Sequence, residues 1–370
     1  MRMRHPFRLL VGAAAVIAIL VVAYLVWRQP QSNGQLVVRY GITPYQDSAL
    51  PVVPERLGWY AKDGIKVELV PLSWDQVMPA LRSGAIDVAI YNMNSFLPAY
   101  ANAAQSGQRR PLFYAPLYVF HGQAIMVHGN AGFQTLAAGA VGTSKPDAAM
   151  VAAVARQLKG KRIAVTRGTE LEQIVLAALS AAGLTEQDVT IIHASPEDSL
   201  AAFLSGNVDA FAGGLTERVE ARRRGGKELL TQSDVMSPVT DGLITTEEFA
   251  KAHPDALDKL VLSWFRTIRY VGADVPRNSA EIRDYLRTAA STRYSPEEYQ
   301  IAWSFEFFPK TPSEAKAVFG DPTSRYYWKA SWNEVGRFIV EHGGAKEIPP
   351  LIAYRGDQVL DRLGGPPSTQ

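Results

Sequence analysis

The sequence contains no cysteine and only six histidines among its 370 residues. Without a thiol, the chain can form no disulfide, no thiolate nucleophile and no thiolate-bound metal site. Only His121 and His128 lie close together, and seven residues apart on a strand-like segment they would face opposite sides. We therefore expect no metal site and no cofactor.

The chain also lacks an excess of charge of either sign. It has 38 Lys and Arg against 36 Asp and Glu, but four of the arginines fall within the first 28 residues, which contain no acid. The remainder therefore carries 34 basic and 36 acidic groups, a net charge of −2. Binding to nucleic acid requires an excess of positive charge, which this part of the chain lacks, so we expect no nucleic-acid partner.

A long uncharged run occurs near the amino terminus, where Leu9–Trp27 follows Arg2, Arg4 and Arg8. As a helix its 19 residues would span about 28 Å, close to the hydrocarbon thickness of a bilayer. No small-residue cleavage site follows, which favours an uncleaved signal anchor, with a cleaved signal peptide as the alternative. The basic segment 1–8 then lies in the cytoplasm, and the chain beyond the linker 28–35 lies outside it, at the outer face of the inner membrane.

Beyond the linker, short apolar runs alternate with amphipathic stretches. The expected strands are 36–42, 65–70 and 87–91, and the expected helices are 52–62 and 74–82. Asn92–Ser95 is expected to be a loop that leads into a helix near Phe96–Ala104. This βαβαβ order is typical of an α/β protein with a mostly parallel sheet.

The clearest strand–helix unit runs from Leu158 to Gly183. Ile163–Val165 is a short strand, and Thr169 with Glu172 gives a capping box at the start of an amphipathic helix. The start of such a helix, just beyond the end of a strand, is where open α/β sheets bind ligands. The alternative is an ordinary unit in which Thr169 only caps its own helix.

One pattern in this region occurs twice. Residues 79–90 read PALRSGAIDVAI and residues 201–212 read AAFLSGNVDAFA, with their Ser-Gly pairs 122 residues apart. That spacing is far longer than a solenoid repeat and favours two similar α/β lobes. Asp87 and Asp209 are interpreted as hydrogen-bonding residues at the start of a strand.

The lobes should be joined by two crossing segments. Arg109–Val127 is apolar and strand-like and should lead into the second lobe, and Ser237–Thr245 should lead back. The remaining chain is expected to be helical over 249–271, 280–290 and 296–308, and it has eleven aromatic residues between Tyr294 and Trp332. Core packing explains that density unless part of it is exposed as a docking surface. The expected division is lobe 1 over 36–115, lobe 2 over 116–239 and lobe 1 again over 240–370.

Several short phrases occur in an order that resembles a known family. They are GWY (58–60) with GIKVE (64–68), LRSG (81–84), LKGK (158–161) with IAV (163–165), GT (168–169), LSGNVDA (204–210) and HPDA (253–256). Over about residues 37–360 this order resembles the nitrate/sulfonate/taurine group of ABC-transporter substrate-binding proteins, which also includes binders of pyrimidine precursors.

The resemblance implies a type II periplasmic-binding-protein fold, in which two α/β lobes joined by two crossover strands close on a small molecule. It also implies ABC permease subunits as partners. By position, the candidate ligand-binding residues of the first lobe are Tyr45, Trp74, Asn92, Asn94 and Ser95. Those of the second lobe are Thr169, Glu170, Gly214, Leu215 and Thr216, and Asp241 lies near the crossover.

The expected ligand is a neutral or amine-bearing organic molecule rather than a small oxyanion. Glu170 would stand at the positive end of its helix, where it satisfies the helix dipole and repels an anion. Some members of the family carry an acid-Pro pair where this chain has Leu215-Thr216, so that recognition acid is absent.

The resemblance thus implies an extracytoplasmic solute-binding receptor of an ABC importer. The alternative is a membrane-anchored ligand-binding sensor or accessory protein that feeds no permease. Related folds include a desulfinase with a Cys nucleophile and a pyrimidine synthase that consumes its own histidine. Because this chain has no Cys and no histidine cluster, we expect it not to be an enzyme.

Overall fold

The computed structural model describes residues 36–103, 109–136, 147–167, 170–236, 239–289, 292–341 and 345–365. The predicted anchor Leu9–Trp27 lies outside these residues. Within them, no helix is both long and apolar enough to cross a membrane. Val38–Gln370 forms one compact unit, separate from Met1–Val37, and contains every described helix.

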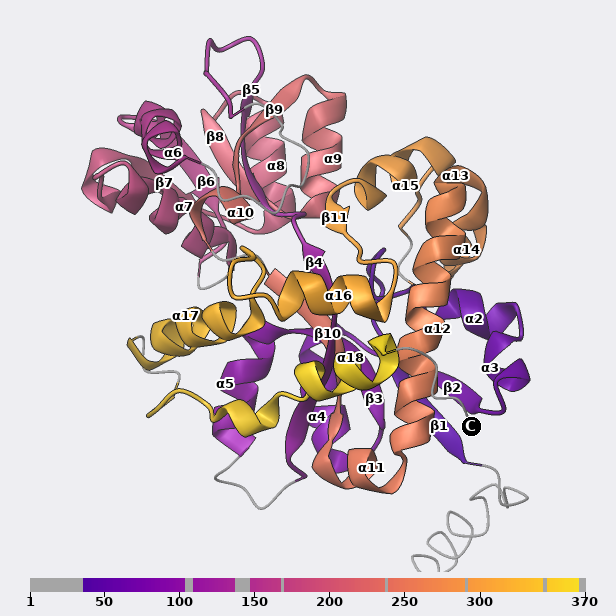
Figure 1. Ribbon diagram of the computed structural model, residues 1–370. Helices are drawn as coiled ribbons and strands as arrows, with labels where there is room; N and C mark the ends of the chain where they lie inside the picture. Colours follow the sequence, from indigo (N-terminus) through magenta and orange to yellow (C-terminus); the bar gives the residue numbers. More distant parts are fainter. Residues whose placement is uncertain are drawn as a thin grey trace, which may run out of the picture. The chain divides into compact units, whose positions relative to one another are not determined.

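The larger of two sheets has six strands in the order β11-β4-β10-β3-β1-β2 (Figure 1). Its strands are β1 (Val37–Ile42), β2 (Lys66–Pro71), β3 (Val88–Asn92), β4 (Pro111–Phe120), β10 (Val239–Thr246) and β11 (Glu306–Phe307). The helices that accompany it are α2 (Val52–Arg56), α3 (Trp59–Lys62), α4 (Trp74–Ser83), α5 (Met93–Ala103), α11 (Glu247–Ala252), α12 (Pro254–Ala273), α13 (Val275–Asn278), α14 (Ala280–Ala289), α15 (Pro296–Trp303), α16 (Pro312–Phe319), α17 (Trp328–Glu341), η3 (Leu351–Ala353) and α18 (Gly356–Gly364).

The smaller sheet has five strands in the order β7-β6-β8-β5-β9. Its strands are β5 (Ala124–His128), β6 (Arg162–Val165), β7 (Thr190–His193), β8 (Ala210–Gly213) and β9 (Gly226–Thr231). Its helices are α6 (Ala148–Ala155), η1 (Arg156–Leu158), α7 (Glu170–Ala181), η2 (Glu186–Asp188), α8 (Pro196–Leu204), α9 (Leu215–Arg223) and α10 (Gln232–Val235). Strand β9 was not expected from the sequence.

Two connections pass between the sheets, as predicted. β4 belongs to the larger sheet up to Phe120, and β5 begins in the smaller sheet at Ala124 (Figure 1). The chain returns from α10 in the smaller lobe to β10 in the larger sheet. The expected α/β fold with two lobes is therefore present.

The expectation of mostly parallel sheets is wrong, because both sheets are mixed. β1 pairs with β3 in parallel, and β6 pairs in parallel with β7 and β8. The strands that carry the crossings, β4 with β10 and β5 with β8 and β9, pair antiparallel. Parallel strands that follow one another in a lobe are joined by a helical crossover. A strand that connects the two lobes needs no such crossover to its neighbour, so it can pair antiparallel with that neighbour.

Two predicted helices are interrupted at identifiable residues. The helix expected over 52–62 is divided into α2 and α3 by Gly58, whose φ of 67° is left-handed. The helix expected over 249–271 is divided into α11 and α12 at His253, because Pro254 takes the first position of the second helix. The helix expected over 296–308 ends at Trp303, and the short strand β11 follows.

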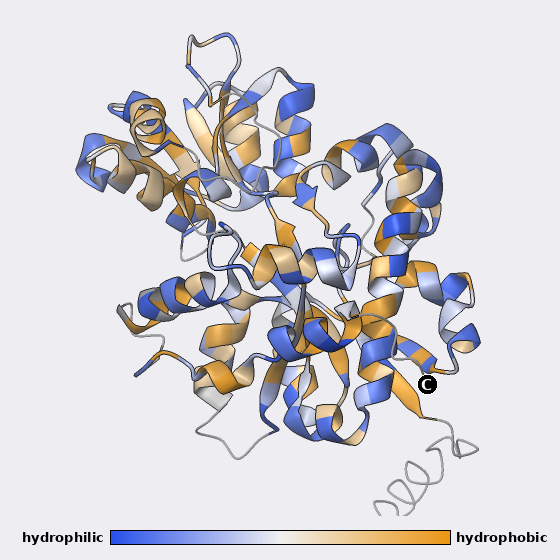
Figure 2. Cartoon of the chain, viewed as in Figure 1, coloured by the Kyte–Doolittle hydropathy of each residue, from blue (hydrophilic) through white to orange (hydrophobic). Residues whose placement is uncertain are grey.

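Each sheet packs its helices through hydrophobic side chains, and Figure 2 shows the strands coloured mainly as hydrophobic. In the smaller sheet, Ile163 and Val165 pack with α7, whereas Ala164 packs on the other face with Phe203 of α8. This alternation follows the two-residue period of a strand. Of the eleven aromatic residues between Tyr294 and Trp332, seven are buried and four are half-buried, so core packing accounts for them.

The repeated sequence pattern forms the same clasp in each lobe. In the larger lobe, Asp87 accepts hydrogen bonds from the backbone N–H and the guanidinium of Arg39, and Arg39 also donates to the carbonyl of Gly84. The backbone N–H of Asp87 donates back to the Arg39 carbonyl. The clasp therefore joins the beginnings of β1 and β3 to the end of α4, where Gly84 has the left-handed φ that its turn requires.

In the smaller lobe the same bonds join Arg162, Asp209 and Gly206. The interpretation of both aspartates as hydrogen-bonding residues is confirmed. The clasps differ in exposure, since the Asp87 side chain is 6% exposed and the Asp209 side chain 33%.

We expect Asp87→Ala to destabilise the protein by about 2–3 kcal/mol, because it removes a buried carboxylate and leaves the backbone N–H and the guanidinium of half-buried Arg39 without their acceptor. Asp209→Ala is the matched control and should cost about 1 kcal/mol or less, because water replaces the lost partner. Urea unfolding of the two variants and the wild type measures both losses. Equal losses would show that burial does not set the strength of the clasp.

Candidate functional site

The first group of site residues lies where β3 ends. Asn92 is the last residue of β3, and α5 begins directly at Met93, so the loop predicted over Asn92–Ser95 is absent. The Asn92 Oδ1 accepts the backbone N–H of Ser95 at 2.7 Å. An amide oxygen in this position caps a free N–H of the first helical turn and lets the helix start without a linker. Asn94, in the same first turn, is half-buried.

A small aromatic surface adjoins this helix start. Trp74, the first residue of α4, stacks on Tyr91 at 4.7 Å between ring centroids and meets Tyr45 edge-on at 6.0 Å. Its indole N–H lies 3.4 Å from the Ser95 Oγ, a long hydrogen bond. Tyr45 is 48% exposed and Trp74 is half-buried. Four of the predicted residues, Tyr45, Trp74, Asn92 and Ser95, are thus linked by direct contacts.

Acidic side chains share a face of the sheet beside this surface. Asp241 of β10 stands opposite Asn92 of β3 and opposite Tyr118 of β4, and Glu306 of β11 stands opposite Phe120 of β4. Residues directly opposite on neighbouring strands point to the same face, and so do residues two apart on one strand. Asp241 and Glu306 therefore emerge on one face.

Two further carboxyl groups approach the same place. Asp47, in the segment after β1, accepts the Tyr118 hydroxyl at 2.9 Å and the backbone N–H of Ser48 at 2.7 Å. Glu170, at the start of α7 in the other lobe, accepts the side-chain N–H of Gln123 at 2.9 Å. Asp47, Glu170, Asp241 and Glu306 are called the acid cluster below.

Three members of the acid cluster are buried, Glu170 is half-buried, and the carboxyl groups repel one another. Asp47, Asp241 and Glu306 are 7%, 3% and 7% exposed. Burial raises the pKa of all four carboxyl groups, and it raises those of Asp241 and Glu306 well above their usual range. Repulsion adds to the rise: the charge of Asp47 raises the pKa of Asp241 and of Glu306, and Glu170 raises that of Asp241. Carboxyl groups from both lobes are therefore within electrostatic range of one another.

Arg218, whose charge acts on Glu306, is already engaged by other partners. The Arg218 Nε lies 2.8 Å from Glu228, and its Nη1 donates to the His121 carbonyl at 2.6 Å. Its guanidinium also stacks on the Phe305 ring at 3.7 Å. Its charge lowers the pKa of Glu306, but this effect is smaller than those of burial and of the neighbouring acids.

The residues that follow β8 lie partly elsewhere. Leu215 is buried in a hydrophobic cluster with Val219, Ala302 and Phe305, so its side chain packs against the segment around α15. Gly214 precedes α9, and Thr216 is exposed and interacts with the Tyr294 hydroxyl. Thr169 lies outside the described residues.

His121 connects the two crossings. Its ring nitrogens contact the Ser233 hydroxyl, on the returning segment, and the Tyr326 hydroxyl. Burial, with the charges of Arg325 and Arg218, lowers the pKa of His121 to about 3, so the ring is neutral at physiological pH. The sequence indicated no such role, and it likewise gave no signal for Asp47, Gln123 or Glu306. Among the described residues, no group of three or more His, Asp or Glu side chains is arranged to hold a metal ion.

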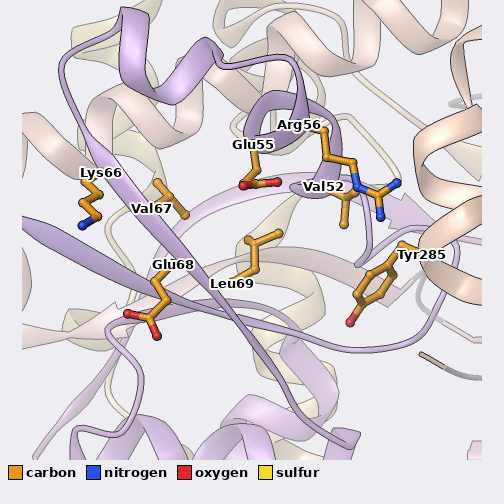
Figure 3. A pocket seen from close by; sticks show the side chains of 8 residues that line it. All are labelled: Val52, Glu55, Arg56, Lys66, Val67, Glu68, Leu69 and Tyr285. Atoms are coloured by element: carbon orange, nitrogen blue, oxygen red, sulfur yellow. The ribbon is translucent and has the colours of Figure 1, made fainter. Parts of the chain in front are cut away.

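A separate pocket of about 500 Å³ lies at the outer edge of the larger sheet (Figure 3). Val52, Glu55 and Arg56 of α2, residues 66–69 of β2 and Tyr285 of α14 line it. Arg56 is held there by Glu281 and Asp284, at 2.7 and 3.0 Å. Because charges of both signs are spread around this edge and some are already paired, we place the candidate site at the acid cluster instead.

Comparison with known proteins agrees with this architecture. The structure of the periplasmic aliphatic sulphonate binding protein SsuA from Escherichia coli superposes with a TM-score of 0.61 at 17% identity, covering 88% of this chain and 98% of that one. The alkanesulfonate-binding protein SsuA from Xanthomonas axonopodis pv. citri, bound to MOPS, gives 0.55 at 18% identity, covering 87% and 99%. These matches define a two-lobed periplasmic-binding-protein fold.

The sequence itself places the chain in a family. The family model described as NMT1-like matches residues 33–286, and the chain belongs to this family. A curated relative, the nitrate import ATP-binding protein NrtC of Synechococcus elongatus, is 29% identical over 190 residues, which are 50% of this chain. The match covers only 27% of that relative's length.

We expect Asp241→Asn to stabilise the protein increasingly as the pH rises from about 4 toward neutrality. A carboxyl group whose pKa is raised on folding binds more protons in the folded state, so wild-type stability falls between the unfolded pKa and the folded one. The amide removes this loss, which is about 1.4 kcal/mol for each unit of pKa rise. The charges of Asp47 and Glu170, which act on Asp241, and the carboxyl group of Glu306, on which Asp241 acts, remain in the variant.

Thermal unfolding of the two proteins between pH 4 and 8 tests this expectation. The exposed Glu68→Gln is the control, because it removes the same charge from another strand of the sheet. If Asp241→Asn is no more stable than the wild type at pH 7, the pKa of Asp241 is not raised on folding and its carboxyl group does not destabilise the folded state.

Proposed function

We propose that this protein is an extracytoplasmic solute-binding receptor that holds a small organic molecule between its two lobes. The observation that carries the proposal is the convergence of Glu170, from the smaller lobe, with Asp241 and the Trp74 surface of the larger lobe. Strand ends and helix starts of an α/β sheet are where this fold binds its ligands. Closure about the two crossings would bury the ligand.

The predicted ligand-binding residues remain part of this proposal: Tyr45, Trp74, Asn92, Asn94, Ser95, Thr169, Glu170, Gly214, Leu215, Thr216 and Asp241. The solved relatives bind sulfonates by name, but the acid cluster would repel such an anion. We therefore propose a neutral or amine-bearing organic ligand. The residues are assigned to binding and not to catalysis.

The proposed partners are the permease subunits of an ABC importer in the inner membrane. Family membership supports this role, as do the binding proteins of the same fold. The proposed location is the periplasmic or extracytoplasmic face. An uncleaved helix over Leu9–Trp27 would tether the receptor to the membrane beside its permease, and a cleaved signal peptide would release it.

A thermal-shift screen of the purified chain tests the receptor function. The compounds are inorganic anions, amines, pyrimidines and aromatic sulfonates. A ligand at 100 times its dissociation constant should stabilise the folded state by about 2.7 kcal/mol, which is a shift of several degrees. A hit in any class supports the receptor, and its class reports the ligand charge. The absence of stabilisation in all classes would contradict the receptor and favour a sensor or accessory role.

Trp74→Ala should weaken binding of any ligand found in that screen by about 1–3 kcal/mol, because it removes the aromatic surface at the start of α4. Glu170→Gln should weaken an amine by more than 1 kcal/mol and leave a neutral ligand almost unaffected. Isothermal titration gives both affinities, and unfolding midpoints of the free variants separate lost binding from lost stability. If Glu170→Gln left the affinity for an amine unchanged, Glu170 would be assigned to its helix start alone.

A further inference from the structure

Among the described residues, no arginine or lysine forms a salt bridge with a member of the acid cluster. Asp47 and Asp241 are held close by the Tyr118 hydroxyl, which donates to Asp47 and also interacts with Asp241. Glu306 accepts one hydrogen bond, from the side chain of Gln46 at 3.3 Å. Arg218 is committed to Glu228. A buried carboxylate without a paired cation is strongly unfavourable, so this arrangement has to be compensated by protonation or by a bound charge.

Orphan acceptor atoms lie at the same place. Among the described residues, the Glu306 Oε2 is buried without a hydrogen-bond partner, and so is the Gln123 Oε1. Gln123 is only 8% exposed, and its other amide atom donates to Glu170 of the acid cluster. Both orphan atoms lack a donor. Buried polar atoms in native proteins are almost always paired, so a ligand with N–H groups would complete the set.

The aromatic surface begins next to these acids. Asp241 is the strand partner of Asn92, Asn92 caps the turn that holds Ser95, and Ser95 contacts the Trp74 indole. Tyr45 precedes Asp47 by only two residues and stands edge-on to Trp74. Aromatic faces attract organic cations through the ring quadrupole, which makes the face of the ring electrostatically negative, most strongly for tryptophan.

We propose that the ligand of this receptor is an organic cation, such as an amine or amidine, whose charged nitrogen lies among Asp47, Asp241 and Glu306 and whose carbon body lies against Trp74 and Tyr45. This inference rests on the proposed receptor function. The larger lobe then recognises the charge of the ligand. Glu170 and Gln123 contact the cation from the side of the smaller lobe when the lobes close. Asp47, Glu306 and Gln123 become specificity-determining residues.

Two isosteric series of probes test the charge of the ligand. Benzamidine, benzamide and benzoate share one ring and differ in charge, and putrescine, 1,4-butanediol and succinate share one four-carbon chain. Each compound is titrated into the wild-type chain and into Asp241→Asn, Glu306→Gln and the exposed control Glu68→Gln. Thermal shift and titration calorimetry measure the affinities, and the free variants are checked for folding by circular dichroism and by their unfolding midpoints.

The proposal expects the cation of at least one series to bind more tightly than its neutral and anionic isosteres. Asp241→Asn and Glu306→Gln should each weaken that cation by about 30-fold or more, because the ligand charge is buried without its partner. Glu68→Gln should leave it within about twofold. Binding should also release protons as carboxyl groups ionise, so the observed enthalpy should differ between phosphate and Tris buffers.

The outcomes separate this inference from the receptor function. Preferred binding of a neutral or anionic isostere, or a cation whose affinity is unchanged in both acid variants, overturns the inference and leaves the receptor in place. If neither series binds, the hits of the broader screen decide: a cationic hit lost in the acid variants supports the inference, and hits confined to other classes overturn it. No binding in the series or in the screen overturns both.

Discussion

The pairing of β4 with β10 is the constraint on which the candidate site depends. These are the strands through which the chain leaves and re-enters the larger lobe, and they pair antiparallel over their whole length, from Val239 opposite Phe120 to Thr246 opposite Pro111. The register sets Asp241 beside Tyr118, and β11 then adds Glu306 at the Phe120 end of β4. A slip of one residue would turn Asp241 to the other face of the sheet. The crossing therefore positions the acids as well as joining the lobes.

The acid cluster has a cost that the rest of the lobe must offset. Each buried carboxyl group is either protonated, which removes its charge, or ionised beside other acids, which is unfavourable. The surrounding structure holds it nonetheless, with the stacked rings of Tyr118 and Trp264 and the bond from Tyr299 to the Gln46 carbonyl. Such a locally unfavourable arrangement is expected at functional sites rather than in a core selected for stability alone.

Local patterns accounted for most of the fold, because strands and helix ends depend on neighbouring residues. The helix that begins at Glu170 and both crossings are found where the sequence pattern places them. The repeat around Asp87 and Asp209 was read correctly because its turn and its hydrogen bonds lie within a few residues and one strand pair. The mixed sheets and the breaks at Gly58 and His253 were missed, since pairing direction and short kinks leave little trace in an apolar pattern.

The sequence indicated fewer residues of the candidate site, for a physical reason. Asn92 ends a strand, Glu170 begins a helix shortly after a strand, and Asp241 lies on the returning strand, so position along the chain was informative about them. Glu306 reaches the same face from a two-residue strand far along the chain, and Gln123 reaches it from the crossing itself. Nothing in the residues beside them marks that destination, because it is fixed by tertiary pairing. A strand of two residues is too short to show the alternation of apolar and polar residues by which strands are predicted.

The contrast between two pairs of aspartates bears on what the acid cluster is for. Asp87 and Asp209 each form a salt bridge with an arginine on the adjacent strand. The arginine compensates the negative charge of the carboxylate. Asp47 and Asp241 are as deeply buried as Asp87, yet no described arginine or lysine forms a salt bridge with either of them. The same chain thus supplies a partner where an aspartate holds the frame together and omits it where strand ends meet across the lobes. An internal arginine at that place would satisfy the acids permanently and close the site to any outside cation. Leaving them unpaired makes their stabilisation conditional on a bound ligand, and ligand binding can then favour one arrangement of the lobes over another.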